Sequence, residues 1–109
     1  MKILVCVSVV PDTTTKITFN DNDTTFTKTG VQFIINPYDE LALTRAIEIA
    51  EQNSGSVDVI TVGEPDCDPI IRKALAMGAN EAFRVNAEPV NSIFVAKQIA
   101  NHAKNNNYD

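Results

Sequence analysis

Segments with the character of β-strands alternate with segments of helical periodicity along this 109-residue chain, and this alternation restricts the possible folds. Strand-like runs occupy residues 3–10, 57–63 and 82–85, whereas apolar residues at helical spacing occupy residues 37–52, 69–77 and 89–104. Successive strand–helix units of this kind build a parallel sheet. We therefore predict an α/β fold with three layers, in which helices cover both faces of a parallel sheet.

The first strand-like run, "ILVCVSVV", is rich in Val and Ile and stops at Pro11. Such a run predicts one strand over residues 3–10 that is buried on both faces. The next segment, residues 13–32, is instead rich in Thr, Asp, Asn and Lys. We interpret this segment as an excursion from the sheet that carries a small hairpin around the "NDND" turn at residues 20–23.

Each predicted helix has recognisable ends. Asn36 suits the N-cap of the first helix, Pro37 suits its first position, and Gly55 is expected to close it. Asp68 followed by proline predicts a second start of the same kind, and Gly78 predicts a left-handed end. The inward faces of the first and third helices are expected to comprise Leu41, Leu43, Ala46, Ile47 and Ala50, and Ile93, Val95, Ala96, Ile99 and Ala103.

Composition limits the classes of partner. A net charge of −5 with nine scattered Lys and Arg residues argues against nucleic acid. Cys6 and Cys67 lack metal-site spacing and are typical of thiols in a reducing compartment. The apolar run near the N-terminus is about eight residues long, too short for membrane insertion or for the core of a signal peptide. We therefore expect a cytoplasmic protein.

Ligands of open parallel sheets bind beyond the carboxyl ends of the strands. These ends are expected at residues 8–12, 36–37, 61–64 and 85–87, and none carries a glycine-rich phosphate motif. His102 is expected to be solvated or at a helix end, and Asp39 and Glu40 do not share a helix face. These features favour a binding domain over an enzyme. Asn36 has two possible roles, because its amide can cap the helix or contact a purine edge or ribose hydroxyl.

Three ordered segments, "ILVCVSVVPD", "INPYDELAL" and "IRKALAMGANEAFRV", closely resemble the N-terminal half of the electron-transfer flavoprotein β subunit. The resemblance implies an adenine-nucleotide-binding fold related to universal stress proteins. It also implies a heterodimer with an α subunit that holds the redox-active FAD, while the β subunit binds a structural AMP or a second FAD. Such a heterodimer carries electrons from dehydrogenases to a membrane quinone reductase or another acceptor, without substrate turnover of its own.

The resemblance also implies a cofactor-binding site, made mostly of backbone contacts from the first strand, the Asn-Pro corner and the end of the 57–63 strand. Its residues are Cys6, Asn36, Pro37, Tyr38, Asp39, Val62 and Gly63. The sequence departs from the family at Ser8, where a lysine is usual, and at Asn80-Glu81, where Asp-Arg is usual. The family continues past residue 109 with a strand and a phosphate-binding loop. Residues 1–109 are thus expected to be the N-terminal portion of a single nucleotide-binding domain.

An alternative function is a stand-alone adenine-nucleotide-binding regulator of the universal stress type, which would need a glycine-rich phosphate loop. The isolated fragment is also expected to self-associate through its sheet, because an unpaired strand edge recruits other strands.

Overall fold

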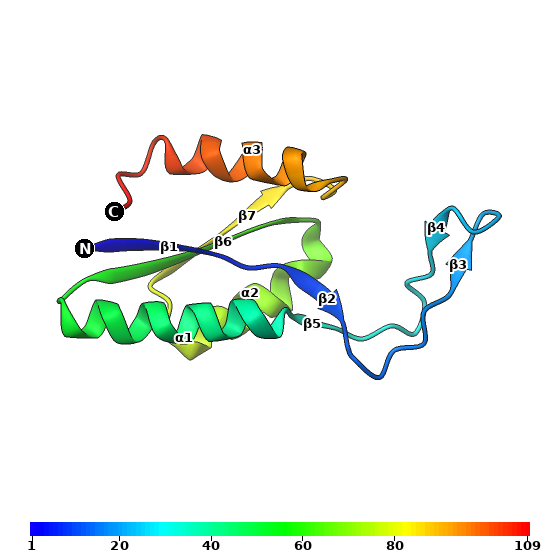
Figure 1. Ribbon diagram of the computed structural model, residues 1–109, viewed down its shortest axis with the longest axis horizontal. Helices are drawn as coiled ribbons and strands as arrows, with labels where there is room; N and C mark the ends of the chain where they lie inside the picture. Colours follow the sequence, from blue (N-terminus) through cyan, green and yellow to red (C-terminus); the bar gives the residue numbers. More distant parts are fainter.

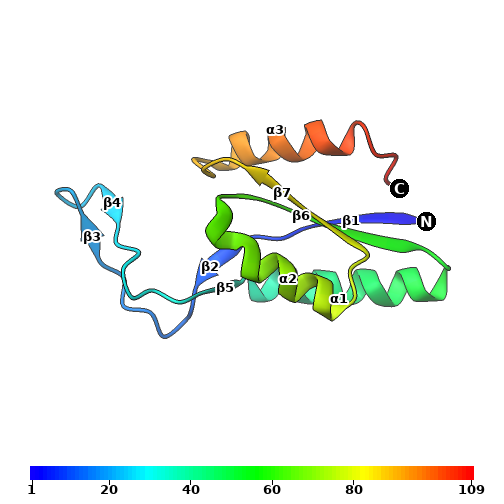
Figure 2. The same cartoon turned by 180° about the vertical axis from the view of Figure 1, so that it is seen from behind.

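The computed structural model describes residues 1–109 and places a parallel sheet between two helical layers (Figure 1). The sheet contains β1 (Lys2–Cys6), β6 (Ser56–Gly63) and β7 (Glu81–Asn86), in the order β1-β6-β7. Helices α1 (Pro37–Gln52) and α2 (Asp68–Met77) cover one face, and α3 (Ser92–Ala103) covers the other (Figure 2). The predicted three-layer α/β arrangement is confirmed.

Strand β6 is the centre of the sheet. It pairs with β1 from Lys2↔Ser56 to Cys6↔Ile60, and with β7 from Asp58↔Glu81 to Gly63↔Asn86, both in parallel. Strands flank it on both edges as far as Ile60, β7 continues to Gly63, and helices cover both faces; every residue from 57 to 63 is buried. The strand predicted at these positions is confirmed.

The predicted single strand over residues 3–10 is wrong. β1 ends at Cys6, and Val9–Pro11 form a separate strand, β2, which pairs antiparallel with β5 (Phe33–Ile35). Only Val5 and Val7 of the run are buried, because β1 has a strand neighbour on one side only. The break lies at Ser8, whose backbone N–H donates to the Asp39 carboxylate instead of to a strand, at 2.7 Å.

The excursion over residues 13–32 carries the predicted hairpin. Strands β3 (Phe19–Asn20) and β4 (Thr25–Phe26) pair antiparallel, and the three turn residues Asp21, Asn22 and Asp23 all have positive φ. Phe26 contacts Phe19 edge to face, with ring centroids 6.3 Å apart, and Phe33 at 6.5 Å. The hairpin projects away from the layered body of the molecule in both views (Figures 1 and 2).

The boundaries of α1 match the prediction at its start but not at its end. Asn36 caps the helix, because its Oδ1 accepts a hydrogen bond from the Tyr38 N–H at 3.0 Å. At the other end, Ser54 rather than Gly55 takes the left-handed conformation, with φ of 52°. Gly55 is needed for a different reason, since a Cβ there would collide with the Met1 carbonyl oxygen.

The start of α2 also differs from the prediction. A 3-10 turn (Pro65–Cys67) precedes it, and the Asp68 N–H donates to the Pro65 carbonyl. Asp68 is therefore already helical and does not act as a side-chain cap. Its carboxylate is free to bind Arg84 of β7, with Nε 2.8 Å from Oδ1. Gly78, with φ of 129°, ends the helix as expected.

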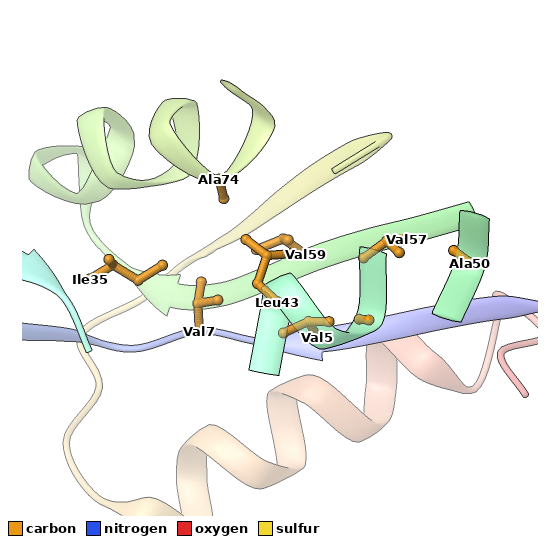
Figure 3. Packing of buried hydrophobic residues seen from close by; sticks show 9 residues of the cluster. Val5, Val7, Ile35, Leu43, Ala50, Val57, Val59 and Ala74 are labelled. Carbon is orange, nitrogen blue, oxygen red and sulfur yellow. The ribbon is translucent and has the colours of Figure 1, made fainter. Parts of the chain in front are cut away.

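The hydrophobic core lies between the sheet and helices α1 and α2 (Figure 3). Its nine buried residues are Val5, Val7, Ile35, Leu43, Ala46, Ala50, Val57, Val59 and Ala74. Leu41 and Ile93 were expected to face inward, but each is 68% exposed, and Ala96 is exposed as well. At 3.6 residues per turn, residues two positions apart point about 160° away from each other, as Leu41 does from buried Leu43 and Ile93 from half-buried Val95. None of the helices has the length and apolar character required to cross a membrane.

A buried carboxylate connects β6 to the end of the chain. Asp58 is 2% exposed, and its Oδ2 accepts a hydrogen bond from the Tyr108 hydroxyl at 2.9 Å and lies 3.5 Å from Lys2 Nζ. His102 Nε2 is 2.9 Å from the same hydroxyl, and the His102 ring packs on Phe83. Since a buried charge is costly without partners, this network makes Asp58 tolerable inside the sheet.

We predict that Tyr108→Phe lowers the free energy of unfolding by about 1–3 kcal/mol, because it leaves a buried carboxylate oxygen without its donor. Tyr38→Phe is the matched control, since Tyr38 is 81% exposed. Urea unfolding of both variants measures the effect. Equal stability of the two variants would show that the Tyr108 hydroxyl does not support Asp58.

Tyr108 also makes the free energy of unfolding depend on pH in the alkaline range. Partial burial, with the hydrogen bond and negative charge of Asp58, raises the pKa of Tyr108 from 10 to about 12. The folded state thus holds this proton more tightly than the unfolded state, and its contribution is complete below pH 10 and lost as the pH rises through about 12. Urea unfolding between pH 10 and about 12 should show that the free energy of unfolding falls more steeply with pH for the wild type than for Tyr108→Phe.

Candidate functional site

A cavity of about 230 Å³ lies at the carboxyl ends of the parallel strands. Its walls come from the segment after β1, the end of β6 with the following loop, the segment after β7, helix α3 and the excursion. The lining residues are Val7, Ser8, Val9, Lys28, Thr61, Val62, Gly63, Glu64, Asp66, Cys67, Glu88, Pro89, Val95 and Ile99. The cavity therefore occupies the position at which open parallel sheets bind their ligands.

Ser8 joins this cavity to the Asn-Pro corner at the start of α1. Its backbone N–H and its hydroxyl both donate to Asp39 Oδ2, each at 2.7 Å. The Asn36 side-chain amide donates to Ser8 Oγ at 3.2 Å, and the Asn36 backbone N–H donates to the Ser8 carbonyl at 2.9 Å. We call these three residues the Ser8 corner. It fixes the first turn of α1 beside the chain that leaves β1.

The predicted site residues differ in their relation to the cavity. Val62 and Gly63 line the cavity directly, whereas Asn36 and Asp39 reach it only through Ser8. Pro37 and Tyr38 are exposed at the start of α1 and do not line the cavity, although the Tyr38 backbone N–H is part of the cap.

Cys6, the remaining predicted residue, precedes the cavity-lining Val7 at the end of β1. Partial burial and the nearby negative charge of Asp39 raise the pKa of the Cys6 thiol. Cys6 is exposed and does not itself line the cavity. Its raised pKa keeps the thiol protonated at neutral pH, and a protonated thiol is a poor nucleophile.

Close packing of Gly63 against Cys67 shapes one wall of the cavity. A Cβ at Gly63 would lie 2.5 Å from Cys67 Sγ, so only glycine fits without movement of that side chain. Burial and the adjacent Asp66 carboxylate raise the pKa of the Cys67 thiol, which is thus also protonated at neutral pH. Arg84 holds the same strand end from the other side, because its Nη1 donates to the Gly63 carbonyl at 3.1 Å.

Several cavity residues were not anticipated as site residues. Lys28 comes from the excursion, Asp66 from the 3-10 turn before α2, and Glu88 and Pro89 from the loop after β7, so no local motif marks them. Val95 and Ile99 carried the signal of an inward helix face, which predicts burial but not a cavity. No group of three or more His, Cys, Asp or Glu side chains is arranged to hold a metal ion.

Comparison with known proteins adds a family relationship. Residues 23–109 match the sequence model of the electron transfer flavoprotein domain. The chain is 42% identical over 82 residues to Protein FixA of Azorhizobium caulinodans, covering 75% of this chain and 29% of that protein. It is 43% identical over 83 residues to the electron transfer flavoprotein subunit beta of Thermoanaerobacterium thermosaccharolyticum, covering 76% and 32%.

A third relative is a subunit of a named complex. The caffeyl-CoA reductase-Etf complex subunit CarD of Acetobacterium woodii is 42% identical over 84 residues, which cover 76% of this chain and 32% of CarD. The chain thus spans about a third of the length of the curated relatives it matches.

We predict that Asn36→Ala lowers the free energy of unfolding by about 1–2 kcal/mol, because it removes both the α1 cap and the hydrogen bond to Ser8. Asn91→Ala is the matched control. It removes only a cap, the acceptor of the Phe94 N–H at 2.8 Å, and should cost about 1 kcal/mol. If urea unfolding finds the Asn36 variant no less stable than the Asn91 variant, the Ser8 corner contributes nothing beyond capping.

Proposed function

This chain belongs to the electron transfer flavoprotein domain family, and we propose that it forms the adenine-nucleotide-binding part of an electron-transfer flavoprotein β subunit. In this proposal the protein is an electron carrier subunit of the cytoplasm and has no substrate turnover of its own. Its fold would be of the adenine-nucleotide-binding type related to universal stress proteins.

The observation that carries the proposal is the cavity at the carboxyl ends of β1, β6 and β7, beside the Ser8 corner. Val62 and Gly63 line it at the end of β6, and valine, proline and isoleucine residues of the lining supply an apolar surface for a flat base. At about 230 Å³ the cavity is smaller than the roughly 300–1,000 Å³ typical of ligand pockets. It therefore suits the base-and-sugar portion of AMP or FAD rather than a whole dinucleotide.

The proposed partner is an electron-transfer flavoprotein α subunit that holds the redox-active FAD. The heterodimer would take electrons from dehydrogenases and deliver them to a quinone reductase or another acceptor. The names of two relatives support an assembly of this kind: CarD is a subunit of a caffeyl-CoA reductase-Etf complex, and an Anaerotignum propionicum relative is the acryloyl-CoA reductase electron transfer subunit gamma. The alternative of a stand-alone universal-stress-type regulator is not favoured, because the family match is to the flavoprotein domain.

We predict that the full-length protein, copurified with its α subunit, releases an adenine nucleotide on acid denaturation and shows flavin absorbance. Val95→Phe should fill the cavity and remove the nucleotide that the β subunit binds, as measured by chromatography of the released nucleotides. Val90→Phe is the control, because Val90 is 63% exposed and does not line the cavity. Absence of both flavin and adenine nucleotide from the wild-type complex would overturn the proposal.

A further inference from the structure

We propose that Arg84 is a positioning residue of the nucleotide site, because it anchors one wall of the cavity without lining the cavity itself. This wall consists of residues 63–67, which we call the wall segment. The inference rests on the proposed nucleotide-binding function. It adds a residue of β7 that supports the shape of the site from outside.

The wall segment connects the end of β6 to the start of α2, and all of its residues except Pro65 line the cavity. Within it, the Cys67 N–H donates to the Glu64 carbonyl at 3.0 Å. Such a local bond shapes the turn but does not fix it to the sheet. The pairing of β6 with β1 stops at Ile60, so β1 does not hold the segment either. A contact from another element is needed to keep the wall in place.

Arg84 provides this contact at both ends of the wall segment. Its Nη1 donates to the Gly63 carbonyl at 3.1 Å, and its Nε donates to Asp68 Oδ1, on the first residue of α2, at 2.8 Å. Nη1 also donates to Asn86 Oδ1 at 2.9 Å, which orients the guanidinium on β7. The nitrogens of a guanidinium lie in one rigid plane, so these bonds fix the position of the β6 end relative to α2.

The environment of Arg84 strengthens this anchor. Its side chain is only 20% exposed, so water and salt screen its charge less than that of a surface ion pair. The charge is felt inside the wall. Burial raises the pKa of the Cys67 thiol, the Asp66 carboxylate adds to the rise, and the positive charge of Arg84 opposes it.

The packing of the wall leaves little room for movement. A Cβ at Gly63 would lie 2.5 Å from Cys67 Sγ, so the two ends of the segment are in close contact. A binding site needs its lining held within about 0.5 Å of the productive geometry. Loss of the Arg84 bonds would free the wall segment and thereby weaken nucleotide binding, although no atom that lines the cavity is removed.

The first test is calorimetric titration with AMP of the full-length protein, purified with its α subunit and stripped of nucleotide. Arg84→Met should weaken AMP binding about tenfold. Arg84→Lys should cause the same loss, because lysine keeps the charge but has one nitrogen in place of the two that bind Gly63 and Asp68. Asp68→Ala leaves the bond to Gly63 and should weaken binding by less. This milder variant keeps the proposal testable if Arg84→Met does not fold.

Tyr108→Phe is the matched control, because it removes a hydrogen bond at the opposite end of β6 and should leave the affinity for AMP unchanged. Hydrogen exchange gives a second readout that does not depend on nucleotide. In Arg84→Met and Arg84→Lys, the amides of Glu64, Asp66 and Cys67 should exchange faster than in the wild type, whereas the β6 amides at 57–60 should not change.

The positioning role is overturned, while the proposed function stands, if both Arg84 variants bind AMP as tightly as the wild type or leave exchange in the wall segment unchanged. Equal weakening by Tyr108→Phe would also overturn it, because the loss would then reflect general destabilisation. If the wild type does not bind AMP, this inference fails, but release of FAD from the β subunit would still support the proposed function. If the wild-type complex releases no adenine nucleotide and no flavin, both proposals fail.

Discussion

The hydrogen bonds of Ser8 hold together the end of the molecule that contains the cavity. Ser8 lies between β1 of the parallel sheet and β2 of the small antiparallel sheet, and it binds the first turn of α1 through Asp39 and Asn36. Three parts of the fold thus meet at one small side chain. A serine can do this because its hydroxyl donates to the carboxylate and accepts from the amide at the same time.

Strand β6 has different roles at its two ends. Near its start, Asp58 is buried and bound by Tyr108 and Lys2, which ties the sheet to the residues after α3. At its end, Val62 and Gly63 line the cavity. The pairing with β1 stops at Ile60, so the end of β6 is held in register by β7, through Val62↔Val85 and Gly63↔Asn86. Arg84 reinforces this by binding the Gly63 carbonyl and the Asp68 carboxylate together.

Features that depend on local chemistry were predictable from the sequence. The Asn36 cap, the hairpin turn and the buried β6 run each follow from a few adjacent residues, and the structure contains all three. The division of residues 3–10 between two sheets was not predictable, because it depends on Asp39, about thirty residues away. Asp68 shows the same limit: its sequence suits a cap, but Arg84 on a neighbouring strand binds its carboxylate instead.

Asn36 shows why a cap and a site are not exclusive alternatives. Its Oδ1 is used by the helix and its Nδ2 by Ser8, so both ends of the amide are occupied within the protein. An amide in this state has only its second N–H and the remaining lone pairs to offer a ligand. The Asn-Pro corner therefore acts on the cavity by positioning Ser8, which lines it. The corner thus stabilises the cavity wall at Ser8, and contact of Asn36 with a nucleotide stays a prediction.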